Sequence, residues 1–264
     1  MKYRICVLYS GSTGNATLVE TPTVSFLIDA GKNVKALGAA LRSVGSDLSR
    51  ISAVFVTHEH SDHVSALEVL SKKYHIPVHI TAASAARFTG DPLSQVPSCI
   101  MIHDSPRFAV PCGEATVISF PIPHDSRMCV GYRIMLTDGD KIVNIGFATD
   151  IGVVTEDVKT GLIGCETVVL ESNHDPEMLL TGSYPYDLKV RIRGRGGHLS
   201  NSDSADLTAF LAENGLKHLI LAHLSAENNR PDIAYDAHFA VLAGTGVEIA
   251  VASPTDPVGF TVED

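Results

Sequence analysis

The chain has 264 residues, 45% of them hydrophobic, and its 20 basic against 30 acidic residues give a formal charge of −10. This composition excludes disordered, collagenous and coiled-coil chains and supplies enough apolar residues for a globular core. The acidic balance argues against a surface wrapped in nucleic acid, so a polyanionic substrate would need a local basic patch or metal ions.

Strands are predicted wherever a short β-rich run ends in turn residues. These runs cover residues 3–9, 15–20, 25–28, 53–56, 78–80, 116–120, 130–136, 142–147, 167–170, 218–221 and 247–251. Helical apolar spacing covers 32–44, 64–74, 202–213 and 233–242, the last expected to start after Pro231 and Asp232. The alternation predicts an α/β sandwich of two sheets with outer helices. Without a linker or a repeat, we expect a single domain over 1–264.

The amino terminus offers only five consecutive apolar residues, Ile5 to Tyr9. A signal peptide needs a longer apolar region and a membrane span needs about 20 such residues. The five cysteines are scattered and form no C-x-x-C pair. We therefore expect a cytoplasmic protein with reduced thiols, with no membrane association and no evident obligate protein partner.

The segment His58-Glu59-His60-Ser61-Asp62-His63 carries the strongest chemical signal. Alternate residues of an extended segment point the same way, so His58 and His60 can hold one metal ion. The chain then turns into a predicted helix, which directs Asp62 and His63 toward a second ion. Imidazole and carboxylate ligands suit zinc, with manganese or iron as poorer competitors. The spacing predicts two divalent ions, for which one segment supplies too few ligands.

Further ligands are expected where later strands end. His124 follows a strand and a proline-stiffened approach, but His103 has nearly the same surroundings and remains its rival. Asp150 ends an apolar run and could bridge two cations or cap the next helix. His223 ends the run 218–223 and could be a ligand or a hydrogen-bonded core histidine.

Taken in order, these residues resemble the signature of the metallo-β-lactamase-fold hydrolases. The segments SGSTGN (10–15), LIDAG (27–31), ESNHD (171–175), GHLSN (197–201) and AHLSAENN (222–229) are similar to the small YycJ/WalJ-type branch. That branch is associated with nuclease activity and is related to ribonuclease Z and ribonuclease J. The resemblance implies an αββα four-layer sandwich of two mixed sheets, with a dinuclear site at one edge.

The resemblance also implies a role for each position and selects His124 over His103. The first metal would be held by His58, His60 and His124. The second would be held by Asp62, His63 and His223, with Asp150 bridging the two. Asp29 would support the loop that carries His58 to His63 without binding metal. His198 would lie near the scissile phosphate, completing a catalytic set with Asp62 and Asp150.

The function expected is phosphodiester hydrolysis, by attack of a hydroxide shared between two metal ions. Metal coordination lowers the pKa of water from 15.7 toward about 7. The resemblance indicates a 5′-to-3′ DNA exonuclease. The chain lacks a metal-binding cysteine in the signature and an export signal, which argues against antibiotic hydrolysis. One alternative is hydrolysis of a small thioester, lactone or cyclic phosphodiester. Another is a non-catalytic metal-binding interaction module, which would require an incomplete ligand set.

Candidate substrate contacts lie outside the ligand set. The dense basic run consists of Lys189, Arg191, Arg193 and Arg195. In a helix, 189/193 and 191/195 would be neighbouring pairs that could follow a nucleic-acid backbone, although a solvated charged face explains them equally well. Asn15 lies in a glycine-rich loop that could instead be a tight turn. Asn173 and His174 could line the pocket or belong to a turn that initiates a helix before Asp175 and Pro176.

Overall fold

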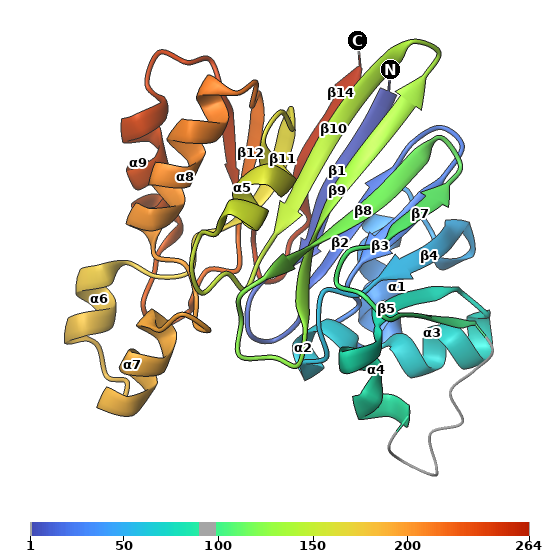
Figure 1. The fold of residues 1–264 in the computed structure, drawn as a ribbon, viewed down its shortest axis with the longest axis horizontal. Helices are drawn as coiled ribbons and strands as arrows, with labels where there is room; N and C mark the ends of the chain where they lie inside the picture. The colour runs from blue at the N-terminus through green and yellow to red at the C-terminus, as the bar shows by residue number, and fades with distance from the viewer. Residues whose placement is uncertain (1, 90–98, 264) are drawn as a thin grey trace.

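The computed structural model describes residues 2–89 and 99–263, which form two seven-stranded sheets packed face to face (Figure 1). The first sheet has the order β14-β1-β2-β3-β4-β5-β6. Its strands are β1 (Lys2–Tyr9), β2 (Ala16–Glu20), β3 (Ser25–Ile28), β4 (Ile51–Phe55), β5 (Val78–Thr81), β6 (Ile100–His103) and β14 (Val258–Glu263).

The second sheet has the order β13-β12-β11-β10-β9-β8-β7. Its strands are β7 (Ala109–Cys112), β8 (Ala115–Ile122), β9 (Cys129–Asp138), β10 (Lys141–Ala148), β11 (Thr167–Glu171), β12 (His218–Ala222) and β13 (Glu248–Val251). Both sheets are mixed: neighbours are parallel from β3 to β6 and from β10 to β13, and antiparallel elsewhere. The carboxyl ends of the parallel strands therefore lie at one edge of each sheet.

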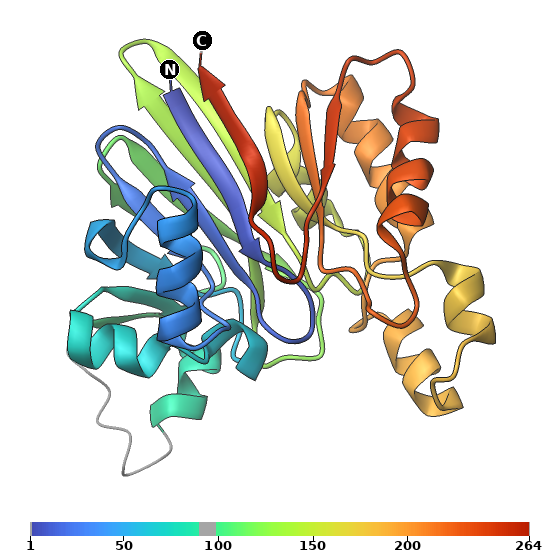
Figure 2. The same ribbon diagram turned by 180° about the vertical axis from the view of Figure 1, so that it is seen from behind.

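Helices cover the outer face of each sheet (Figures 1 and 2). The first sheet carries α1 (Val34–Ser43), the 3₁₀ turn η1 (Leu48–Arg50), α2 (Ser61–Val64), α3 (Leu67–Tyr74) and α4 (Ala82–Thr89). The second carries α5 (Glu156–Leu162), α8 (Asn201–Glu213) and α9 (Pro231–Leu242), while α6 (Pro176–Thr181) and α7 (Tyr186–Arg193) stand off beside it. Within the described part of the chain, no helix has the length and apolar character needed to cross a membrane.

Three buried clusters hold the four layers together. The central cluster joins the inner faces of the two sheets, for example Phe26 and Phe55 with Tyr132 and Ile145. Two outer clusters join each sheet to its own helices. Burial of apolar area on both faces is the main stabilising term for such sheets, and it explains why the central strands read as continuous apolar runs. The predicted αββα sandwich is confirmed.

The predicted elements match the structure, with specific differences. All the predicted strands occur, with ends shifted by a residue or two, whereas β6, β7, β14 and helices α4 to α7 were not predicted. The helix expected over 64–74 is two helices, because the amide of Ala66 donates to the Ala30 carbonyl outside the helix. The helix expected after Pro231 starts at Pro231 itself, where a missing amide proton costs nothing.

Candidate metal centre

A group of histidine and carboxylate side chains lies where strands of both sheets end at their shared edge. The strand preceding each segment is β3 for Asp29, β4 for His58 to His63, β8 for His124, β10 for Asp150 and β12 for His223. Asp29, Asp150 and His223 have left-handed backbones, with φ of 60°, 60° and 58°. This conformation is uncommon outside glycine and concentrates at functional sites. The fold thus brings all the predicted ligands together.

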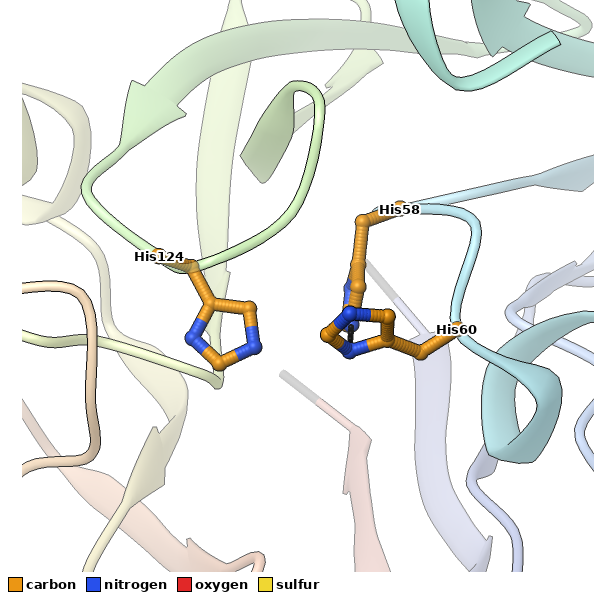
Figure 3. Close-up of side chains that lie close together, drawn as sticks. All are labelled: His58, His60 and His124. Carbon is orange, nitrogen blue, oxygen red and sulfur yellow. Dashed lines mark hydrogen bonds between the residues drawn. The ribbon is translucent and has the colours of Figure 1, made fainter. Parts of the chain in front are cut away.

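The first cluster consists of His58, His60 and His124, whose candidate ligand atoms all lie within 4.8 Å of one another. Figure 3 shows the three rings converging from two loops. His58 Nε2 and His60 Nδ1 are 2.9 Å apart. This arrangement matches the three-histidine half of the predicted site, and His103 lies elsewhere, stacked on Phe108 and bonded to His79.

The second cluster consists of Asp62, His63 and His223, again within 4.8 Å of one another. His63 Nε2 lies 3.4 Å from Asp62 Oδ2. Asp62 and His63 occupy the first turn of α2, directly after the segment that carries His58 and His60, and the His63 ring lies 4.1 Å from the His58 ring, centroid to centroid.

Asp150 stands between the two clusters. Its Oδ1 lies 3.7 Å from His124 Nε2 and its Oδ2 lies 3.6 Å from His63 Nε2. Both separations are too long for hydrogen bonds, but a shared cation between the atoms would account for them. Burial alone would raise the pKa of the Asp150 carboxyl, yet the imidazoles of His223 and His63 hold it well below its ordinary value.

Three of the histidines are fixed through Nδ1 by an oxygen acceptor. His63 Nδ1 donates to Asp29 at 2.8 Å, His124 Nδ1 to the Gly197 carbonyl at 3.1 Å, and His223 Nδ1 to Glu171 at 2.9 Å. Each bond selects the tautomer with an unprotonated Nε2, the form that can bind a metal, and it orients the ring. Asp29 also accepts from the Thr57 amide and hydroxyl, both at 2.8 Å, and Thr57 immediately precedes His58.

The donor set fits divalent metal ions. Asp150 Oδ2 and His223 Nε2 are buried and, among the described residues, have no hydrogen-bond partner. Buried polar atoms of this kind usually have a partner, so a pair of orphans in one cluster indicates bound cations. Nitrogen and carboxylate oxygen donors without thiolate are typical of zinc and of other first-row divalent metals.

Glu171, at the end of β11, is a site residue that sequence reasoning missed. Its carboxylate accepts from His198 Nδ1 at 2.8 Å and from His223 Nδ1 at 2.9 Å. Burial would raise the pKa of Glu171, but these two imidazoles lower it to about 2. Burial disfavours charge on His198, yet Glu171 raises its pKa to about 9. The available signal was a carboxylate at the carboxyl end of an apolar strand, the same signal that marked Asp150.

The structure places three predicted substrate contacts around the centre. The buried amide of Asn15 bonds to Asp62 Oδ2 at 3.2 Å and to His63 Nε2 at 3.1 Å, so it contacts two candidate ligands. Asn173 is buried and donates to the His223 carbonyl at 2.8 Å. His174 is buried beside it, with Nδ1 3.3 Å from Asn173 Oδ1.

The basic run divides into two parts. Lys189 donates to the carbonyls of Leu180 and Gly182, and Arg191 pairs with Asp125 at 2.5 Å. Arg193 and Arg195 are exposed, and the described residues offer neither of them an ion-pair partner. Helix α7 ends at Arg193, so 189 and 193 share the helix, whereas 195 lies beyond it and is not a helical neighbour of 191.

Comparison with known proteins bears on the fold and the centre. A model described as a β-lactamase superfamily domain matches residues 25–224. The exodeoxyribonuclease YycJ of Bacillus anthracis is 34% identical over 263 residues, covering 97% of this chain and 97% of that protein. The exodeoxyribonuclease WalJ of Streptococcus pneumoniae serotype 2 is 31% identical over 258 residues, covering 94% and 93%. The metallo-β-lactamase fold protein YhfI from Bacillus subtilis has a TM-score of 0.70 at 18% identity, covering 99% of both chains, and therefore shares the fold.

Proposed function

The chain belongs to the β-lactamase superfamily and is a metal-dependent hydrolase, and from that premise we propose that it is a dinuclear 5′-to-3′ DNA exonuclease. The family resemblance inferred from the sequence is confirmed. Support for a DNA substrate comes from two relatives named exodeoxyribonuclease, which match nearly the whole chain.

The observation that carries the proposal is the cluster of donors around Asp150, with two orphaned atoms buried inside it. One ion would be held by His58, His60 and His124. The other would be held by Asp62, His63 and His223. Asp150 would bind both ions. Zinc is the ion that this donor set favours. When bound, two such ions supply Lewis acidity toward phosphate oxygens and lower the pKa of water.

The neighbouring residues would orient the metal ligands and supply a proton to the substrate. Glu171 and the Gly197 carbonyl orient His223 and His124 through their Nδ1 atoms. Glu171 also accepts from His198 Nδ1, which leaves Nε2 of His198 to face a phosphodiester. From there His198 would donate a hydrogen bond to the phosphate, or a proton to the leaving oxygen.

The test is nuclease turnover in Asp62→Ala and Asp150→Ala, with folding checked by circular dichroism. Loss of an outer partner of a metal ligand already costs about 10- to 100-fold, so loss of a ligand itself is expected to lower kcat by more than about 100-fold. Asp140→Ala, in an exposed turn, is the matched control and should leave turnover unchanged. Turnover near that of the wild type in both ligand variants would refute the scheme.

The substrate is tested on a panel of single-stranded DNA, double-stranded DNA, RNA and a thioester. Oligonucleotides labelled at either end distinguish the direction of digestion by the first product released. We expect mononucleotides to be released first from the 5′ end of DNA. Efficient thioester hydrolysis without cleavage of any nucleic acid would instead identify a small-molecule hydrolase that uses the same centre.

A further inference from the structure

A cavity of about 370 Å³ opens beside the metal centre. His198 and His223 line it, together with Tyr184, Leu188 and Ile192. Cavities that bind small molecules span roughly 300–1,000 Å³, so this one is at the small end of that range. It has room for a single nucleotide rather than a base pair.

The apolar wall of this cavity, Tyr184, Leu188 and Ile192, comes from α7 and the bend before it, in the part of the chain that stands off from the sandwich (Figures 1 and 2). Leu188 and Ile192 are four residues apart on α7, the spacing that places side chains on one face of a helix, and Tyr184 lies in the bend just before that helix. No residue of α7 is buried, so the body of the protein does not cover this face. Among the described residues nothing bonds to the Tyr184 hydroxyl, and its half-buried ring borders the cavity.

The charge of this wall does not suit phosphate. Arg191 borders the cavity but is engaged by Asp125, and Glu227 contributes an exposed carboxylate at the rim. An aromatic ring flanked by two aliphatic side chains favours a flat apolar group instead. Stacking of a nucleobase on an aromatic side chain contributes about 1–3 kcal/mol per base, with little dependence on which base it is.

A path for phosphates can run through a second cavity, which shares His198 with the first. The second cavity, of about 490 Å³, is bordered by His198, His174 and Arg193, together with the carboxylates of Glu177 and Asp203. Arg193 also borders a neighbouring cavity of about 530 Å³, which is lined by Arg195 and Lys159 and by the carboxylates of Asp203 and Asp206. These two exposed guanidinium groups, which have no carboxylate partner in the described structure, can follow a phosphate backbone.

We propose that the 370 Å³ cavity binds the terminal nucleobase of a single strand, stacked on Tyr184, while the strand continues past His198 along Arg193 and Arg195. This assignment rests on the proposed nuclease function and specifies its substrate as an unpaired strand end. It makes Tyr184 a residue that recognises a base, separate from the groups that handle the phosphate.

The test compares oligonucleotides whose digested end carries either a normal or an abasic terminal nucleotide. The wild type should cleave the normal end with a kcat/KM about 5- to 150-fold higher, the equivalent of one stacked base. In Tyr184→Leu the normal end should lose this advantage, while the abasic end is cleaved as in the wild type. Tyr184→Phe keeps the ring and should restore the preference.

Tyr186→Leu is the matched control, since Tyr186 is 78% exposed and does not border this cavity. It should retain the preference for the normal end. Equal cleavage of both ends by the wild type, or a preference that survives in Tyr184→Leu, overturns the base pocket while the nuclease function stands. Absence of cleavage on every nucleic acid refutes the proposed function and this assignment with it. Unchanged metal content and thermal unfolding in Tyr184→Leu would establish that any lost preference reflects the missing ring.

Discussion

Glu59 lies between two proposed ligands, yet its carboxylate serves two other segments. Oε1 accepts from the amide of Arg127 at 2.8 Å, and Oε2 accepts from the Ser84 hydroxyl at 2.7 Å. Arg127 is three residues beyond His124. Glu59 therefore ties the loop that carries His58 to the loop that carries His124, and so fixes the separation of their rings.

Glu59→Ala is expected to weaken metal binding at the three-histidine cluster by about 10- to 100-fold, the usual effect of losing a group that orients ligands. Glu59→Gln should retain binding, because its carbonyl can accept from Arg127 and its amide can donate to Ser84. Ser84 would then donate to the Met128 carbonyl, 2.9 Å away. Metal content after dialysis against a graded chelator measures the effect, with the exposed Glu68→Ala as control. Full retention of both ions in Glu59→Ala would show that Glu59 is not needed to hold the His58 loop and the His124 loop together.

His238 is fully buried and bonds to the Ala234 carbonyl at 2.8 Å and to Ser204 Oγ at 3.0 Å. Burial lowers its pKa to about 4, from 6.5 in the unfolded chain. The unfolded state therefore takes up a proton first as the pH falls below 6.5, and folding loses stability until about pH 4.

Lowering the pH from 7 to 5 should reduce the free energy of unfolding by about 2 kcal/mol through His238 alone. Urea unfolding of the wild type and of His238→Gln at both pH values measures the cost. The variant should lose about 2 kcal/mol less on acidification. Parallel losses in the two proteins would show that His238 is protonated in both the folded and the unfolded state.

The spacing of His58, His60, Asp62 and His63 indicates metal binding from the sequence, and the family resemblance adds His124, Asp150 and His223, but neither indicates Glu171. A single carboxylate at a strand end resembles many others. Only the parallel pairing of β11 with β12, which sets Glu171 opposite Ala222, places it beside His223. Arg191 illustrates the same limit, since its partner Asp125 is remote in sequence.

At the scale of elements, the loop after β3 is packed directly against the start of α2. The Gly31 amide donates to the Asn15 carbonyl, and the Asn15 amide donates to the Asp62 carbonyl at 2.7 Å. A Cβ at Gly31 would lie 1.6 Å from that Asp62 carbonyl oxygen. The helix that presents Asp62 and His63 therefore depends on the absence of a side chain at Gly31.

Gly31→Ala should lower the free energy of unfolding by at least about 2 kcal/mol and reduce metal content, because backbone must move to relieve the overlap. Gly38→Ala is the control, since a Cβ there meets only side-chain atoms, the nearest at 3.3 Å, and alanine favours the α1 helix. Denaturant unfolding and metal analysis of both variants measure the difference. Equal stability of the two would show that the loop can move at little cost.

Central elements were predictable from the sequence and peripheral ones were not. Strands buried on both faces read as apolar runs, but β6, β7 and β14 are half exposed along their length and lack this signal. The break between α2 and α3 was also hidden, because it depends on a hydrogen bond to Ala30, a residue far away in the sequence.

At the scale of the whole molecule, the two sheets repeat one topology. β14, β1, β2 and β3 are antiparallel and lead into parallel β4 to β6, just as β7 to β10 lead into parallel β11 to β13. Asp29 after β3 and Asp150 after β10 occupy matching strand ends, both with φ of 60°. The sequence shows no repeat, so this correspondence is visible only in the fold, and the metal centre lies where the halves meet.

The last strand, β14, pairs with the first, β1, along six residue pairs, from Lys2 with Glu263 to Val7 with Val258. A circular permutant opened between exposed Asp104 and Ser105, with a short linker joining the old ends, would encode one sheet after the other. In the permutant, β14 and β1 would be close in sequence instead of lying at opposite ends of the polypeptide. Pairing them would then require a shorter loop to close, so the permutant should refold faster than the parent. Stopped-flow refolding measures this, and a slower permutant would mean that the terminal strand docks after the rate-limiting step.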